Sequence, residues 1–335
     1  MCTNVQAYKR RDPEDADAEE HVENLFNTLC SVLLEPIGRQ AFVEAEGIEL
    51  MLILLKERRF ARLRALKVIS HAVSGHDATS TASCTRLVEA RGLGPLFSAF
   101  MQKGNRKYKK EYKSFSETED EEHTAAILAA LFRSLPTSLA GVAGNQGAAL
   151  STRDRLLFKF MENDMEKLDR LLELRDSWWI KVAAVDADID ARRRRLLKRS
   201  HDRISHEDES DEDDEDDDTE LHPDVIYLRR LEAGLFTVQM VDLVIAQLCT
   251  LDTSVQQHVS MILRRSGRSI EDVCVDVAEY ASAIGDEETG GDAEVDLLAR
   301  ERSQQERARA LKLARRLARL CKADGKRPST SEVAS

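Results

Sequence analysis

The chain is poor in the residues that interrupt helices or build small cross-linked domains. Its 335 residues include 6 prolines, 15 glycines and 6 cysteines, and only 5% are aromatic. The cysteines are scattered, with no CxxC pair or Cys/His ligand spacing, which argues against a zinc module or a disulfide scaffold and favours a reducing compartment. No apolar run approaches the roughly 18 residues that cross a bilayer, and residues 1–20 contain no hydrophobic signal region. We therefore expect neither a membrane partner nor export.

Signatures of catalysis are also missing. Gly141, Gly144 and Gly147 are evenly spaced, but no GK[ST] follows, which excludes a phosphate-binding loop. The eight histidines include no HExxH motif, and no Ser, Cys or His stands in a known nucleophile signature. The sequence predicts a protein that is not an enzyme, with no cofactor and no metal.

The net charge of −12 belongs to one segment. Residues 207–220, EDESDEDDEDDDTE, hold 12 of the 61 acidic residues, and the remaining 49 balance the 49 basic ones. Such a run repels itself and cannot bury apolar surface, so we expect 200–221 to be a disordered acidic linker. Ser210 within it is a possible site for an acid-directed kinase, where phosphate would deepen an existing charge.

This linker divides the chain, and the rest reads as helix with a period near 3.6 residues. In residues 59–75 the polar positions Arg64, Lys67 and His71 form one narrow stripe on an otherwise apolar helix. A longer helix over about 165–199 has apolar residues near the heptad spacing of a coiled coil, interrupted by Arg175. The expected organisation is listed from the N-terminus: a disordered leader (1–20), repeats with the long helix (21–199), the linker (200–221), C-terminal repeats or a cap (222–286), and a basic amphipathic helix with a disordered tail (287–335).

An internal repeat indicates the fold class. Residues 42–48, FVEAEGI, match residues 87–93, LVEARGL, at an offset of 45 residues, and an apolar helix follows each block. Short helix, glycine, helix and longer helix with this period is typical of armadillo and HEAT repeats. Gly47 and Gly92 are expected to allow a sharp turn between the first two helices. The sequence predicts an all-α, armadillo/HEAT-type α-solenoid, a right-handed superhelix of helical repeats.

In such a solenoid the third helix of each repeat lines the concave binding face. We expect those helices at 22–34, 60–74 and 121–135. Their polar stripes are the candidate partner-binding residues, which are Asn24, Asn27, Ser31, Arg64, Lys67, His71 and Arg133, the last on a track with Ala126 and Ala130. For each single residue, a plain solvated surface position is the alternative interpretation.

Several stretches are more specific than a general repeat. They include ENLFNTLCSVLL (23–34), RLLFKFMENDMEKLDRLLEL (155–174) and YLRRLEAGLF (227–236). On these the chain resembles the C-terminal portion of the beta-catenin-like family of armadillo proteins. The resemblance implies a nuclear, non-enzymatic adaptor of pre-mRNA splicing. It would bind spliceosomal proteins, especially basic, nuclear-localisation-like segments of splicing factors, within the spliceosome-activating complex.

Basic clusters suggest nuclear-import signals, although purely structural roles for these residues stay open. The candidates are Arg192, Arg193, Arg194, Arg195, Arg315, Arg316, Lys326 and Arg327. The four successive arginines abut the acidic run, so mutual neutralisation is the favoured alternative there. The amphipathic helix near 310–320 could bind acidic partners or phosphate, but a helix of this kind more often packs back on its own protein.

Two competing functions remain at this point. One is a generic armadillo or HEAT scaffold outside the nucleus, and a homo-oligomer is possible in either case. The other is direct RNA binding through a basic loop and the basic tail. The basic residues of loop 103–115 alternate with Tyr108, Tyr112 and Phe115, which could stack on bases.

Deleting residues 207–220 tests the linker assignment. A segment that cannot bury apolar surface adds nothing to the packed structure, so helical circular dichroism and the melting temperature should stay nearly unchanged. A large fall in either would show that the acidic run belongs to the fold.

Overall fold

The computed structural model describes residues 2–57, 59–136, 150–204, 221–285 and 293–324, and every regular element in these ranges is a helix. In chain order they are α1 (Cys2–Gln6), η1 (Ala7–Lys9), α2 (Ala16–Val32), α3 (Pro36–Glu44), α4 (Gly47–Glu57), α5 (Arg62–Val73), α6 (Ala78–Glu89), α7 (Leu93–Phe100), α8 (Asn105–Glu111), α9 (Glu117–Ser134), α10 (Thr152–Met161), η3 (Asn163–Met165), α11 (Glu166–Ile204), α13 (Pro223–Glu232), α14 (Leu235–Leu251), α15 (Thr253–Arg265), α16 (Ile270–Ala283) and α17 (Ala293–Asp324). The predicted all-α fold is confirmed.

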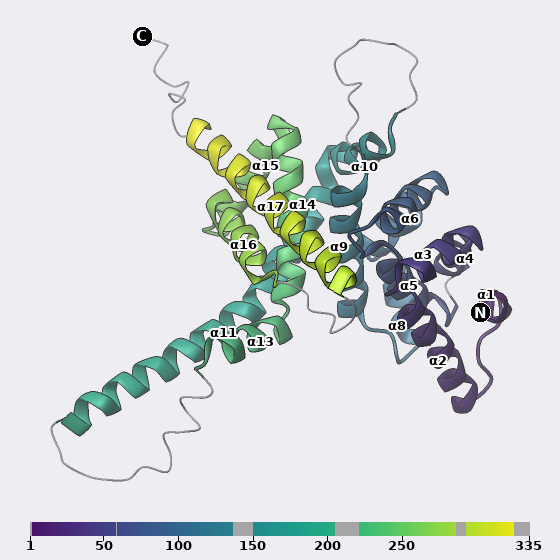
Figure 1. Cartoon of the computed structure of the whole chain (residues 1–335), viewed down its shortest axis with the longest axis horizontal. Helices are drawn as coiled ribbons and strands as arrows, with labels where there is room; N and C mark the ends of the chain where they lie inside the picture. The colour runs from purple at the N-terminus through teal and green to yellow at the C-terminus, as the bar shows by residue number, and fades with distance from the viewer. Residues whose placement is uncertain (1, 58, 137–149, 205–220, 286–292, 325–335) are drawn as a thin grey trace.

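The helices repeat in groups of three. The groups are α3–α4–α5, α6–α7–α9 and α10–α11–α14, with α8 inserted in the second and α13 in the third. The third helices α2, α5, α9 and α14 pack side by side in that order, and the first helices α3, α6 and α10 form a second row beside them (Figure 1). This is the stacking of an armadillo-type solenoid, and the three predicted third helices occupy equivalent places in it.

The glycines of the repeat have a different physical role from the one expected. The turn between first and second helices places the left-handed conformation on the preceding residue, with φ of 54° at Glu46 and 60° at Arg91. A Cβ on Gly47 would lie 2.3 Å from the Phe42 ring, and one on Gly92 would lie 2.6 Å from the Leu87 carbonyl oxygen. Glycine is needed here because the second helix starts against the first, so its role is close approach.

The leader is another correction. Residues 1–20 were expected to be disordered, yet α1 and η1 lie in this range and α2 begins at residue 16. The Val5 side chain is fully buried against the solenoid. Asp12 accepts hydrogen bonds from the Phe60 amide and the Tyr112 hydroxyl, each at 3.0 Å. The described part of the leader is therefore attached to the first and second repeats through polar contacts that no local pattern reveals.

Helix α11 extends well beyond the other helices (Figure 1). It continues to Ile204, past the predicted boundary at residue 199, while residues 205–220 with Ser210 lie outside the described residues. Its first half is anchored by Arg175, which is fully buried and contacts Asp242 of α14 at 2.6 Å and Asp276 of α16 at 2.8 Å. The apparent break in the heptad pattern is thus the point that ties three helices together, because a buried charge requires such partners. Coiled-coil pairing of this helix stays a prediction.

Helix α17 packs antiparallel to α16 and crosses α14, in front of it in Figure 1. Its apolar residues Ala310, Leu313 and Leu317 are buried. The predicted amphipathic helix therefore folds back on its own solenoid.

In the described part of the chain no single helix is long and apolar enough to cross a membrane. Helices α13 and α14, which are bent by 76° relative to each other, reach that length and composition only as a pair.

Gly47→Ala tests the close-approach role of the repeat glycine. The added methyl group would overlap the Phe42 ring, and overpacking of this kind costs about 1–3 kcal/mol. Denaturant unfolding should show that loss. Gly285→Ala is the matched control, because nothing lies within 4 Å of a Cβ there, and equal losses in both variants would contradict the explanation.

Candidate functional site

A row of polar side chains crosses the first three third helices. We call it the third-helix row; its residues are Asn24 and Asn27 of α2, Arg64, Lys67 and His71 of α5, and His123 of α9. The Lys67 ammonium donates to the Asn27 side-chain carbonyl at 3.1 Å. Asn24 and Asn27 are exposed. Because the contacts run between repeats, the row is one continuous surface over α2 and α5.

The charges of this row are balanced locally. The Arg64 guanidinium pairs with Glu23 of α2 and lies 3.7 Å from Glu119 of α9. Burial, together with Lys67, lowers the pKa of His71. Burial, with His71 and Lys67 next in effect, lowers the pKa of His123 from 6.5 to about 4. Both imidazoles are therefore neutral near pH 7, and the row carries two basic groups opposite two glutamates.

Two candidates, Ser31 and Arg133, and the track residue Ala130 make contacts different from those of the row, although Ser31 is exposed. Ala130 is 2% exposed. The Ser31 hydroxyl donates to the Asn27 backbone carbonyl at 3.1 Å, within its own helix. Arg133 donates to the carbonyl oxygens of Ser74 at 2.9 Å and Gly75 at 3.0 Å. Arg133 thus closes the C-terminal end of α5 and is engaged inside the protein.

The same arrangement recurs at each third helix, and the sequence analysis missed it. Arg39 donates to the Leu33 carbonyl after α2 at 2.7 Å. Arg153 donates to the Phe132 carbonyl of α9 at 2.7 Å, and Arg316 of α17 to the Thr250 carbonyl of α14 at 3.0 Å. The last carbonyls of a helix have no partner within it, so each end is closed by an arginine from a neighbouring element. Two of the capping residues, Arg39 and Arg153, lie in first helices, and an arginine at this place in the repeat is the sequence feature that could have predicted the caps.

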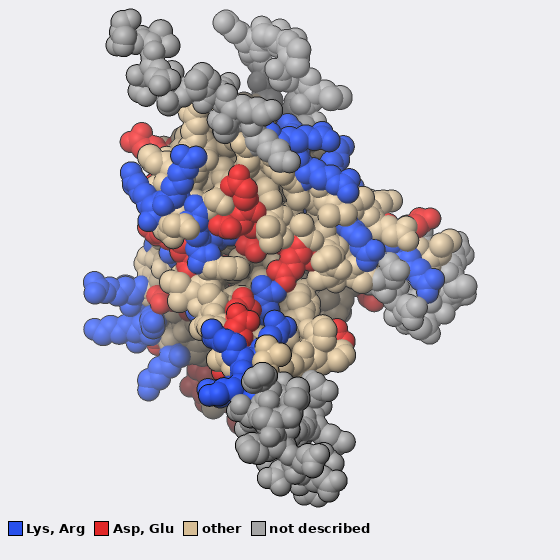
Figure 2. All heavy atoms as spheres, turned by 90° about the vertical axis from the view of Figure 1, so that its left-hand side faces the viewer, with Lys and Arg blue, Asp and Glu red and all other residues tan. Residues whose placement is uncertain are grey.

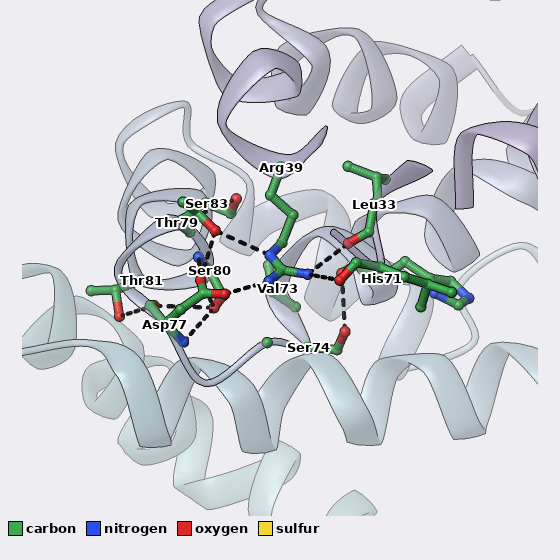
Figure 3. A network of polar contacts seen from close by, with 12 residues as sticks. Leu33, Arg39, His71, Val73, Ser74, Asp77, Thr79, Ser80, Thr81 and Ser83 are labelled. Carbon is green, nitrogen blue, oxygen red and sulfur yellow. Dashed lines mark hydrogen bonds and ion pairs between the residues drawn. The ribbon is translucent and has the colours of Figure 1, made fainter. Parts of the chain in front are cut away.

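Figure 3 shows the first of these capping sites. The Arg39 guanidinium lies between the Leu33 carbonyl and the Asp77 carboxylate, and its Nε donates to the Thr79 hydroxyl at 3.1 Å. Asp77 also accepts from the Ser80 amide at 2.9 Å, which caps α6. One aspartate thereby neutralises the arginine that closes α2 and starts the next repeat.

The basic import candidates are dispersed. Arg193, Arg194 and Arg195 are exposed on the far part of α11, whereas Arg192 pairs with Asp188 at 3.1 Å. Arg315 is exposed on α17, Arg316 caps α14, and Lys326 and Arg327 lie outside the described residues. Figure 2 shows Lys and Arg in several separate groups on its face. That face has no continuous basic stripe.

The loop expected to offer aromatic rings to RNA is folded differently. Residues 105–111 form α8, Tyr108 is 4% exposed and Phe115 is 7% exposed. The Tyr108 hydroxyl donates to the Arg59 carbonyl at 2.8 Å. These two rings are core residues and cannot stack on bases, although Lys107, Lys109 and Lys110 around them are exposed.

Within the described ranges, no group of three or more His, Cys, Asp or Glu side chains is placed to hold a metal ion. The geometry that stands out is a long, uncovered polar row on stacked helices. Such a surface can recognise an extended segment of another protein.

Comparison with known proteins agrees with this architecture. A family model described as catenin-beta-like, Arm-motif containing nuclear, matches residues 1–277. The chain belongs to the catenin-beta-like family. It is similar to beta-catenin-like protein 1 of Bos taurus, with 38% identity over 287 residues, and of Homo sapiens, with 37% over 287 residues. The homologue of Schizosaccharomyces pombe is 30% identical over 280 residues.

The resemblance found in the sequence is thereby confirmed. The matches to the Bos taurus and Homo sapiens proteins cover 85% of this chain and 45% of each of those proteins, and the match to the yeast protein covers 84% and 41%. The chain thus spans less than half the length of these catenin-beta-like relatives. Helix α17 lies beyond the residues that the family model matches.

The buried histidine of the row predicts a pH dependence of stability. His123 has a pKa of about 4 when folded and 6.5 when unfolded, so the unfolded chain binds more protons between these values. Stability should therefore fall as pH falls through this window, by about 1–2 kcal/mol from this residue between pH 7 and pH 5. Urea unfolding at both pH values should show that His123→Gln loses correspondingly less than the natural chain. The exposed His21→Gln should behave like the natural chain, and equal pH dependence in all three would contradict the assignment.

Proposed function

We propose that this protein is a nuclear, non-catalytic adaptor of pre-mRNA splicing that binds segments of splicing factors along the third-helix row. The family supports the armadillo architecture and is described as nuclear. The observation that carries the proposal is the difference between the two ends of the solenoid. The row is exposed at Asn24 and Asn27 on α2 and half-buried on α5 and α9, with no described helix packed over it, whereas α17 packs over α14.

The chemistry of the row suits the backbone of an extended segment. Asn24 and Asn27 are one helical turn apart, and each side-chain amide offers donors and an acceptor. An extended segment exposes an amide and a carbonyl at each residue, and those groups need such partners when they leave water. Asparagines at this spacing can bind main-chain groups with little dependence on side-chain sequence.

The electrostatics of the row is compatible with a basic segment. Glu23 and Glu119 neutralise Arg64, and the lowered pKa values of His71 and His123 keep both imidazoles uncharged near pH 7. Lys67 is the remaining cation of the row. The row therefore presents little positive charge to repel lysines and arginines of a partner.

Two alternatives are retained from the sequence. A general armadillo scaffold outside the nucleus would use the same row with other partners. Direct RNA binding has less support, because the Tyr108 and Phe115 rings are buried.

Replacing the exposed amides tests the row directly. Asn24→Arg together with Asn27→Arg adds two large cations at its start, which should block a docked segment and repel a basic one. In nuclear extracts of cells that express the tagged full chain, quantitative mass spectrometry should show splicing factors with the natural chain and about a tenfold loss with this variant.

The matched control changes two exposed amides away from the row. Gln40 on α3 and Gln257 on α15 are exposed, and Gln40→Arg with Gln257→Arg should retain the splicing factors. Cytosolic location of the tagged natural chain, or equal recovery with both variants, would refute the proposal.

A further inference from the structure

A second site lies where α17 crosses the ends of α9 and α14. A pocket of about 350 Å³ opens between these helices and α10. Its cationic lining residues are Arg133, Arg153, Arg309, Lys312 and Arg316. The single carboxylate that lines it, Glu306, is 6% exposed and contacts His76 at 3.3 Å. Five basic side chains and one acid thus surround one small volume.

Arg153 shows that part of this charge has no ion-pair partner within the described residues. Its side chain is 7% exposed, and its partners are uncharged: the Phe132 and Leu135 carbonyls and the Gln247 side-chain oxygen at 3.1 Å. Its Nε is buried without a hydrogen-bond partner in the described part of the chain. A buried guanidinium in this state is costly, because burial disfavours a charge that has no counter-ion.

The first capping site shows what is missing. Arg39 closes α2 as Arg153 closes α9, and it is equally buried at 4% exposure. Arg39, however, has the Asp77 carboxylate beside it (Figure 3). No carboxylate in the described ranges forms an ion pair with Arg153, so the equivalent place is open to an anion from outside.

The other cations of the pocket point to more than one negative charge. Arg309 and Lys312 are exposed on α17, and the one carboxylate that lines the pocket, Glu306, is paired with His76. Arg133 and Arg316 use part of their guanidinium groups for helix ends and keep further N–H donors. One chloride or one carboxylate would leave most of this charge unneutralised.

We propose that this pocket binds a small oligophosphate, a compound with two or more linked or neighbouring phosphate groups. Phosphate oxygens match the planar donor fork of arginine, and several phosphates concentrate charge in a small volume. A nucleic-acid strand spreads its charge along a line and is usually bound by a groove that follows its backbone. Here the cations line one pocket, which favours the compact ligand.

Bound oligophosphate would act on the protein by neutralising these cations. The pocket is formed jointly by α17 and by residues of the second and third repeats, so a ligand in it bridges the C-terminal helix and the solenoid. A ligand that binds only the folded chain stabilises it. Inorganic tripolyphosphate should therefore raise the melting temperature more than sulfate does at the same ionic strength.

Titration calorimetry of the full chain with tripolyphosphate tests the site. Arg309→Gln with Lys312→Gln removes two exposed cations of the pocket and should weaken binding by about tenfold or more. Arg315→Gln with Arg319→Gln is the matched control, because both residues are exposed on α17 and neither lines the pocket. It should change the affinity by less than about twofold. Arg153→Gln should abolish binding, but it also removes a helix cap, so the α17 pair is the deciding variant.

Four results would overturn the proposal. The first is absence of saturable tripolyphosphate binding in the millimolar range. The second is equal weakening by the two α17 pairs, which would indicate general attraction to a basic helix. The third is tighter binding of a single-stranded RNA oligonucleotide with the same dependence on Arg309 and Lys312. The fourth is a tenfold gain in tripolyphosphate affinity on deletion of residues 207–220, which would show that the acidic run of the chain itself fills the pocket.

Discussion

The carbonyl ends of the third helices impose the constraint on which this solenoid depends. A helix leaves its last carbonyls unpaired, and a buried unpaired carbonyl is expensive. Here Arg39, Arg133, Arg153 and Arg316 each reach such an end from another element. Every cap therefore joins two helices, which are neighbours in sequence at Arg39 and far apart in sequence at Arg133 and Arg316. The same arginine–carbonyl hydrogen bonds hold neighbouring helices together and satisfy the helix ends. A repeat therefore cannot detach without exposing both an arginine and an uncapped helix end.

The two ends of the stack differ in what covers them. On α2, α5 and α9 the polar row is open, and its two cations, Arg64 and Lys67, are balanced by Glu23 and Glu119. At α14 the helix α17 has replaced solvent, and its cations gather over the pocket. One solenoid thus offers a neutral, elongated surface and a compact basic one. The first suits a protein segment, and the second suits a small anion.

Much of the fold could be predicted because the helices and repeats follow from the local spacing of apolar and polar residues. The 45-residue repeat around Gly47 and Gly92 identified the architecture, and the narrow polar stripe of α5 identified the exposed face of a third helix. The resemblance to the catenin-beta-like family was equally readable from short specific stretches. What failed depended on partners far away in sequence. Arg175 interrupts a heptad pattern, and its neighbours in the sequence give no sign that it pairs with Asp242 and Asp276, which are 67 and 101 residues away.

The candidate site was predictable only in part, for the same reason. Asn24, Asn27, Lys67 and His71 were found because helical spacing places them on one face. Arg133 has the same spacing and yet turns to the end of α5, since a long side chain can reach a neighbouring backbone that periodicity does not describe. The leader was misjudged because Asp12 is bound by Phe60 and Tyr112, which come close only after folding.

Helix α17 lies outside residues 1–277, which the family model matches, and yet it carries the arginine that closes α14. A helix within the matched region therefore depends for the capping of its end on a segment outside that region. Removing α17 would leave the Thr250 carbonyl without this donor and would expose the apolar surface on which Leu313 and Leu317 pack. Truncation before α17 would thus destabilise α14 as well as remove the pocket.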